Sequence, residues 1–161
     1  LLPDSEEPVR LQLSANQIKL TFGQTELISK LVDGKFPDYT KVIPQNNTRE
    51  FVLGRETLMA ALTRIAILTT DRFKGVRWVL APGSLKLSST NADQEDAQEE
   101  LEIDYSGEPL DIGFNVTYLL DVLANLKTEH VRFSLGDALG SALVTMPESE
   151  KFKYVVMPMR I

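Results

Sequence analysis

The sequence has no cysteine and only one histidine among its 161 residues. Without cysteine, the chain can form no disulfide and offers no thiolate to a metal or a substrate. The single histidine, His130, opens a predicted strand, where a solvated position is expected, and no motif marks a nucleophile for it to activate. These absences give little support to thiol, zinc or triad chemistry, so we expect no catalytic residue, no cofactor and no metal site.

Long apolar runs and phosphate-binding loops are also missing. No apolar stretch is long enough to span a bilayer and no signal peptide is recognisable, so we expect no membrane partner. The glycine pair in "GDALG" (136–140) lacks the lysine and the Ser/Thr of a phosphate loop, and it joins two predicted strands. Nucleotide binding through such a loop is therefore not indicated.

The net charge of −6 is concentrated in one stretch. Residues 93–104, "DQEDAQEELEID", contain seven acidic residues and no lysine or arginine, and subtracting this −7 from the total leaves +1 for the rest. Overall acidity argues against a free-standing nucleic-acid binder. Two interpretations of the stretch remain open: a strand whose charges prevent edge-to-edge aggregation, or an acidic edge that pairs with a basic partner.

Periodicity predicts many short strands and two helices. Residues 8–32 alternate apolar and polar side chains and predict a three-stranded meander. Beyond a linker near residues 44–47, the helices are expected at 55–68 and 115–126, with Asn115 as an N-cap. The remaining expected strands are 49–54, 75–81, 84–90, 99–105, 110–114, 130–136, 142–146 and 152–159.

The order strand, helix and three strands occurs twice after the linker. Aligning Gly54 with Asn115 places Leu58 on Leu119 and Leu62 on Leu123. A repeat of about 60 residues whose units cannot bury their own faces implies two units packed as one domain. We expect an α+β fold with antiparallel sheets, a doubled βαβββ unit at 45–161, and at 1–44 the trailing part of a similar, incomplete unit.

Several long motifs together carry a resemblance to a known family. They are "SKLVDGKFPDYTKVIP" (29–44), "GFNVTYLLDVL" (113–123) and "YVVMPMRI" (154–161), with "AILTTDRFKGVR" (66–77) and "YSGEPLDIGFNV" (105–116) as further matches. The chain resembles the bacterial sliding clamps, the beta subunits of DNA polymerase III. The resemblance implies the DNA-clamp fold, with 1–44 as the end of the middle domain and its connecting segment, and 45–161 as the C-terminal domain. It also implies a fragment that lacks the parts needed to close a ring.

The resemblance further implies a non-enzymatic processivity factor that tethers the replicative polymerase to DNA. Clamps of this family dock short linear peptides of the DNA polymerase III core, the clamp loader, other polymerases and repair proteins. The positions that match this pocket are Pro37, Thr40, Lys41, Val42, Tyr118, Leu139, Ser141, Val155, Met157, Pro158, Met159 and Arg160. Thr40 and Lys41 depart from the arginine positions of the best-known members, which leaves the polar side of peptide preference open.

Family clamps also close head to tail as dimers around double-stranded DNA, in the cytoplasm and at the nucleoid. Ile67 and Leu68 match the apolar part of the dimer interface, and Glu95 and Glu99 match acidic positions facing a partner's basic residues. Arg64 and Lys127 are the expected DNA-facing positions. Sliding through a closed ring needs only weak phosphate contacts, so an acidic chain is compatible with this function.

Three alternatives stay open at the level of sequence. A small acid–base hydrolase would use Glu95 and Glu99 in a deep cleft with a raised pKa. A generic β-rich adaptor would lack the doubled βαβββ architecture. In the third alternative, Val155, Met157 and Met159 form only a last core strand and no partner covers them. A separate question concerns residues 1–44, whose sheet would pack either in cis or against a neighbouring chain.

Overall fold

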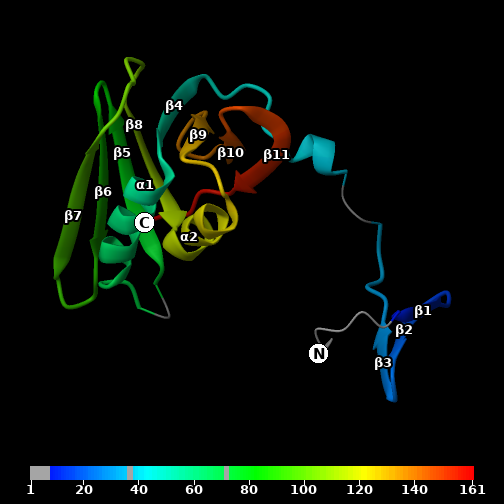
Figure 1. The fold of residues 1–161 in the computed structure, drawn as a ribbon. Coiled ribbons are helices and arrows are strands. Elements are labelled where there is room, and N and C mark those ends of the chain that lie inside the picture. Colours follow the sequence, from blue (N-terminus) through cyan, green and yellow to red (C-terminus); the bar gives the residue numbers. More distant parts are fainter. Residues whose placement is uncertain (1–7, 36–37, 71–72) are drawn as a thin grey trace. The chain divides into compact units, whose positions relative to one another are not determined.

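The computed structural model describes residues 8–35, 38–70 and 73–161. The chain divides into two compact units, Leu1–Asp38 and Tyr39–Ile161. Each unit has its own sheets, which are visible in Figure 1. The two units are therefore considered one at a time.

The first unit is the predicted three-stranded meander. Its strands are β1 (Arg10–Leu13), β2 (Gln17–Phe22) and β3 (Thr25–Lys30), paired antiparallel in that order. The β2–β3 turn is tight, because Phe22 pairs with Thr25, and Gly23 adopts φ 52°, a conformation that favours glycine. Within residues 8–35 no side chain is buried, and Leu13 and Ile28 are exposed. This sheet lacks a core of its own.

The second unit contains the predicted repeat. A short 3-10 helix, η1 (Tyr39–Lys41), precedes it. The first copy is β4 (Arg49–Gly54), α1 (Arg55–Ala66), β5 (Gly75–Ala81), β6 (Ser84–Thr90) and β7 (Asp96–Glu102). The second is β8 (Leu110–Asn115), α2 (Val116–Asn125), β9 (His130–Leu135), β10 (Ala142–Met146) and β11 (Ser149–Val156). The doubled βαβββ prediction is confirmed.

The two copies exchange their first strands. One sheet has the order β11-β10-β9-β4 and the other β7-β6-β5-β8, so β4 joins the strands of the second copy and β8 joins those of the first. All neighbours are antiparallel, with Gly54 opposite His130 and Gly75 opposite Asn115. Neither copy can therefore complete its sheet without the other.

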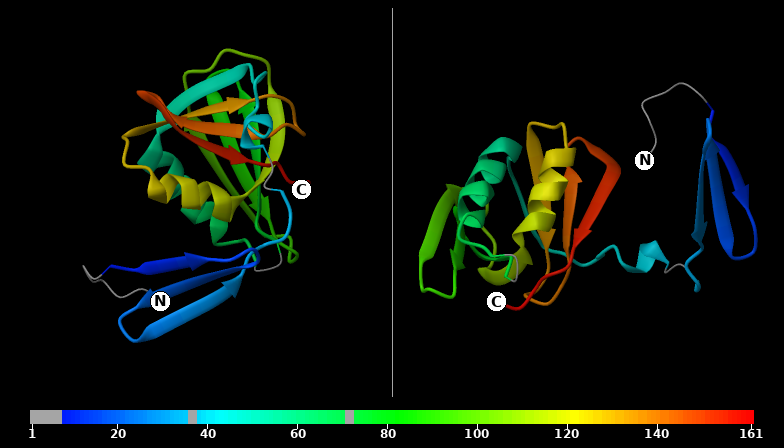
Figure 2. Two further views of the ribbon diagram at one scale, coloured as in Figure 1. Left: turned by 90° about the vertical axis from the view of Figure 1, so that its right-hand side faces the viewer. Right: turned by 90° about the horizontal axis from the view of Figure 1, so that it is seen from below.

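The core lies between the two sheets and beneath the two helices. Figure 2 shows α1 and α2 side by side along one side of the sheets. The predicted apolar face of α1 is fully buried, at Leu58, Ala61, Leu62 and Ile65. Aromatic rings join the sheets: Trp78 of β5 lies with its ring centroid 5.1 Å from that of Phe133 of β9. Burial of such large rings is a main source of stability.

The helix boundaries agree with the capping expectation for α2. The side chain of Asn115 accepts a hydrogen bond from the Thr117 amide at 2.9 Å, which confirms it as N-cap. Arg55, at the start of α1, donates to the carbonyl of Leu123 in the last turn of α2, so its charge also complements that helix end. Across the described ranges, no helix has the length and apolar content needed to cross a membrane.

The predicted boundaries of three elements were wrong by two or more residues. Strand β7 covers 96–102 rather than 99–105. Its pairing with β6 runs from Asp96, opposite Thr90, to Glu102, opposite Ser84, which is the first residue of β6. Helix α1 ends at Ala66, and Ile67 and Leu68 follow in a turn. Strand β11 ends at Val156 rather than continuing through Met159, since the chain leaves β10 at that point.

The buried face of α1 gives a stability prediction. Leu62→Ala is expected to lower the free energy of unfolding by about 2 to 5 kcal/mol, because it removes a fully buried side chain and leaves a cavity. Urea unfolding followed by the fluorescence of Trp78, the single tryptophan, would measure this. The neighbouring exposed Thr63→Ala is the control and should change stability by about 0.5 kcal/mol or less. Equal effects for the two variants would contradict the packing described.

Candidate functional site

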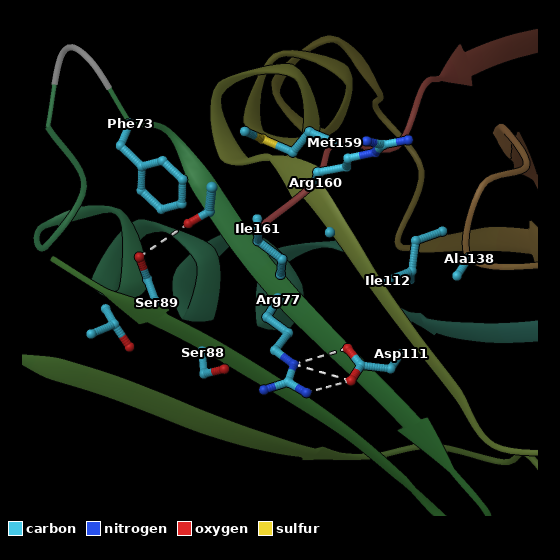
Figure 3. Close-up of a pocket in the computed structure, with 13 residues that line it drawn as sticks. Phe73, Arg77, Ser88, Ser89, Asp111, Ile112, Ala138, Met159, Arg160 and Ile161 are labelled. Atoms are coloured by element: carbon cyan, nitrogen blue, oxygen red, sulfur yellow. Dashed lines mark hydrogen bonds and ion pairs between the residues drawn. The ribbon is translucent and has the colours of Figure 1, made fainter.

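The last five residues, Met157–Ile161, form a terminal segment that lies outside the β-ladder. Strand β11 ends at Val156, where it pairs with Ala142 of β10. Three residues later the backbone amide of Met159 donates to the carbonyl of Gly113 in β8, at 2.9 Å. The terminal segment therefore passes from one sheet to the other, as Figure 3 shows. Met157 is left 72% exposed at the crossing.

A cavity of about 540 Å³ lies beside the terminal segment. Its walls come from β5, β6, β8 and the terminal segment itself (Figure 3). The lining residues are Phe73, Gly75, Arg77, Ser88, Ser89, Thr90, Asp111, Ile112, Gly113, Ala138, Met159, Arg160 and Ile161. The wall combines apolar groups near the terminal segment with polar groups further along the strands.

An ion pair between β5 and β8 forms the polar side of this cavity. Arg77 Nε donates to Asp111 Oδ1 at 2.9 Å, and a second guanidinium nitrogen also contacts the carboxylate. These hydrogen bonds lower the pKa of Asp111, with the positive charge of Arg77 adding to the effect. Both side chains are about half exposed, so the pair is a modest, solvent-screened interaction.

The predicted pocket residues fall into separate groups. Met159 and Arg160 line the cavity, and Pro158 lies beside them, half-buried. Tyr118 on α2 and Leu139 in the β9–β10 loop are large apolar side chains, 53% and 77% exposed. Ser141 and Val155 lie at the neighbouring ends of β10 and β11, where Ala142 pairs with Val156.

The remaining predicted pocket residues come from the segment around η1. Thr40 and Lys41 belong to η1, Val42 follows it, and all three side chains are exposed. Pro37 lies outside the described residues. Further along the same segment, the side-chain Nδ2 of Asn47 donates to the backbone carbonyls of Ser134 and Ser141 at 2.7 and 3.0 Å. Asn47 therefore holds the connection against the end of β10.

Sequence reasoning missed three residues around the terminal segment. Phe73, Gly75 and Gly113 all line the cavity, and Gly113 contacts the terminal segment through its backbone. One signal was present: Gly113 lies inside the apolar strand "LDIGF", where glycine is unfavourable and often marks the close approach of another backbone. Nothing in the local sequence marked Phe73.

Arg64 and Glu99 contact each other, although the resemblance gives Arg64 to DNA binding and Glu99 to the dimer interface. Arg64 Nε donates to Glu99 Oε1 at 2.6 Å and its Nη2 donates to Oε2 at 2.9 Å. This bidentate pair ties α1 to the edge strand β7. Glu95 precedes β7 and accepts from the side-chain amide of Asn91. Both carboxylates therefore have partners on an accessible edge rather than in a deep cleft.

The other predicted interface and DNA-facing residues are solvent-accessible. Ile67 is 78% exposed in the turn after α1, and Leu68 beside it is half-buried. Lys127 is exposed after α2 and lines a shallow cavity of about 640 Å³ with Arg55 and His130. His130 opens β9 with an exposed side chain, as expected for a solvated strand start.

The Arg64–Glu99 pair lowers the pKa of Glu99, mainly through the hydrogen bonds from Arg64. A lowered pKa is opposite to what a general acid requires, which argues against the hydrolase alternative. The pKa of Glu99 is lower in the folded state than in the unfolded state, so the pair stabilises the fold fully at pH values above the ordinary pKa of a glutamate. This contribution is lost as the pH falls through the folded-state pKa of Glu99.

We predict that Arg64→Ala raises the pKa of Glu99 towards its ordinary value, because the hydrogen bonds and the positive charge are removed. A carboxyl-carbon NMR titration would measure the change. Arg77→Ala is the matched control: it should raise the pKa of Asp111 and leave that of Glu99 unchanged. A Glu99 pKa that is insensitive to Arg64→Ala would show that the pair does not persist in solution.

Comparison with known proteins identifies the family. The family model for the C-terminal domain of the DNA polymerase III beta subunit matches residues 40–160, and the model for its central domain matches residues 1–38. The beta sliding clamps of Pseudomonas putida and Escherichia coli K12 are 46% and 42% identical over all 161 residues. The chain spans 44% of the length of either relative.

Solved structures agree with this match. A sliding clamp from Pseudomonas aeruginosa, crystallised with a ligand, is 44% identical and superposes with a TM-score of 0.81 over 98% of this chain and 43% of its own. A second structure from that organism, bound to griselimycin, is 46% identical with a TM-score of 0.80, over 95% of this chain and 42% of its own. The chain therefore belongs to the DNA polymerase III beta subunit family, the bacterial sliding clamps.

Proposed function

We propose that the chain is the C-terminal part of a processivity clamp and serves as a non-catalytic docking surface for short peptides of its partners. The observation that carries the proposal is a set of large apolar side chains that the second unit leaves exposed. Met157, Tyr118 and Leu139 come from three different elements, and each is more than half exposed. The family resemblance gives all three to one pocket, and contiguous exposed apolar surface is typical of a partner site.

The chemistry of these side chains suits a variable peptide partner. Methionine is flexible and polarisable, so Met157 and Met159 can adapt to different side chains of a bound peptide. Tyr118 adds a rigid aromatic surface with a polar tip. A P. aeruginosa clamp bound to griselimycin supports the proposal, because it shows that a close relative accepts an external ligand.

We assign the remaining pocket positions from the family resemblance. Thr40, Lys41 and Val42 would contribute from the connecting segment, and Pro37, which lies outside the described residues, is the other position that the resemblance gives to it. Ser141, Val155, Pro158 and Arg160 would complete the wall. In this proposal residues 1–44 belong to the middle clamp domain and 45–161 form the C-terminal domain. The partners would be the polymerase III core, the clamp loader, and other polymerases and repair proteins of the cytoplasm.

A second surface would serve head-to-tail dimerisation. Strand β7 is an edge of its sheet and carries exposed acidic residues, and Ile67, in the turn after α1, is exposed as well. An acidic edge beside an apolar group suits a basic strand of a partner subunit. Glu99 would then meet a partner cation in competition with Arg64. Lys127, which is exposed, would be the stronger of the two proposed DNA-facing charges, since Arg64 is already paired.

We predict that Met157→Ala or Tyr118→Ala weakens the binding of a labelled polymerase-derived peptide by about tenfold, because each removes an exposed apolar contact. Fluorescence anisotropy with griselimycin as competitor would measure the affinity. Ile67→Ala is the matched control, since it truncates an equally exposed apolar side chain outside the proposed pocket, and it should leave the affinity unchanged. Unchanged affinity in both pocket variants would remove the basis of the proposal.

The dimer surface can be tested in a ring-forming background. The P. putida clamp with its last domain replaced by residues 45–161 would supply the missing partner surface. Ile67→Asp is expected to shift this chimera from dimer to monomer in sedimentation velocity, because it buries an unpaired charge at the contact. Met157→Ala is the control here and should sediment as a dimer. A dimer that persists with Ile67→Asp would assign the interface elsewhere.

A further inference from the structure

We propose that Gly75 and Gly113 form a seat that holds the terminal segment and so sets the position of the proposed docking side chains. The two glycines lie on neighbouring strands, β5 and β8, and both face the terminal segment at the cavity wall. This inference rests on the proposed docking function, because it concerns how Met157 and Met159 are positioned for a peptide.

Gly113 leaves room for the backbone of the terminal segment. A β-carbon at this position would lie 2.5 Å from the carbonyl oxygen of Met159 and 2.9 Å from the side chain of Ile161. The same glycine accepts the Met159 amide hydrogen bond. Because the first clash is with backbone, no change of rotamer relieves it. Any side chain at position 113 must push the terminal segment away.

Gly75 leaves room for side chains instead. A β-carbon there would lie 2.6 Å from the ring of Phe73 and 2.9 Å from a methyl group of Ile161. Both groups are ends of side chains with some freedom, and both are partly exposed. Substitution of Gly75 should therefore disturb the terminal segment less than substitution of Gly113.

Backbone conformation does not explain either glycine. The described glycines with positive φ are Gly23, Gly34 and Gly83, so neither Gly75 nor Gly113 needs the left-handed region. Glycine inside a strand weakens that strand, and the usual compensation is the close approach of another chain segment. Here that segment is Met159–Ile161, which lies across β5 and β8 in Figure 3.

The seat acts on the docking surface through a short connection. Met157 is separated from Met159 only by Pro158, whose ring fixes one backbone angle. Displacing Met159 therefore also displaces Met157. Gly75 and Gly113 are positioning residues in this scheme and need not touch the bound peptide.

Methionine methyl NMR can observe the seat directly. The chain has four methionines, of which Met157 and Met159 flank the seat while Met59 and Met146 pack against the core. In the 161-residue chain, Gly113→Val is expected to shift the Met157 and Met159 methyl signals and leave those of Met59 and Met146 in place. Gly113→Ala is the smaller variant in case valine prevents folding, and Gly75→Ala should give smaller shifts than Gly113→Ala.

Binding of griselimycin, measured by calorimetry, supplies the functional readout. We expect Gly113→Ala to weaken binding by about tenfold without abolishing the folded state. Ser88→Val is the matched control, because it adds a branched side chain to the same cavity from β6, away from the terminal segment in Figure 3. It should change neither the methionine signals nor the affinity.

The outcomes separate the two proposals. Unshifted Met157 and Met159 signals in Gly113→Ala would overturn the seat, as would equal effects of Ser88→Val and Gly113→Ala. Shifted signals with unchanged griselimycin affinity would overturn the link between seat and docking. If the wild-type chain does not bind griselimycin but Gly113→Ala shifts only the two terminal methionines, the seat stands as a structural device and the docking proposal fails.

Discussion

The exchange of first strands between the two βαβββ copies is the constraint on which the second unit depends. Because β4 completes the sheet of the second copy and β8 that of the first, each sheet contains strands from both halves of the sequence. The aromatic rings of Phe51, Trp78, Phe114 and Phe133 then pack where the two sheets face each other. Folding must bring residues far apart in sequence together before either sheet is complete, which favours one cooperative transition.

The same exchange positions the proposed docking surface. Strand β8 is an edge of its sheet, so its Gly113 carbonyl is open to accept a hydrogen bond from outside that sheet. The terminal segment comes from β11, an edge of the other sheet, and makes that bond through Met159. The surface thus lies where both sheets end. Its shape depends on the packing of the whole domain rather than on one loop.

The hydrophobic periodicity of the sequence was sufficient to predict most helices and strands, but it did not predict which strands pair with each other. Alternation and helical spacing identified the strands and the buried face of α1, including Leu58 and Leu62, because burial imposes a period on each element. The strand exchange could not be read from periodicity, which carries no information on which strands pair. The register of β7 was missed for the same reason, since Ile103 and Tyr105 are buried beyond the end of the strand. The candidate pocket positions came from the family motifs, and the Arg64–Glu99 pair emerged only when α1 was placed against β7.

The acidic edge of the sheet limits which surfaces can associate with it. Residues 93–104 carry no positive charge, so two copies of this edge repel each other and cannot extend their sheets through like strands. A strand that continues this sheet is favoured when it brings cations, and such a strand differs from β7 itself. Contacts between unlike surfaces have a direction, and when they close they leave every subunit facing the same way around the ring. A single stretch of like charge is thus enough to give an assembly two distinguishable faces.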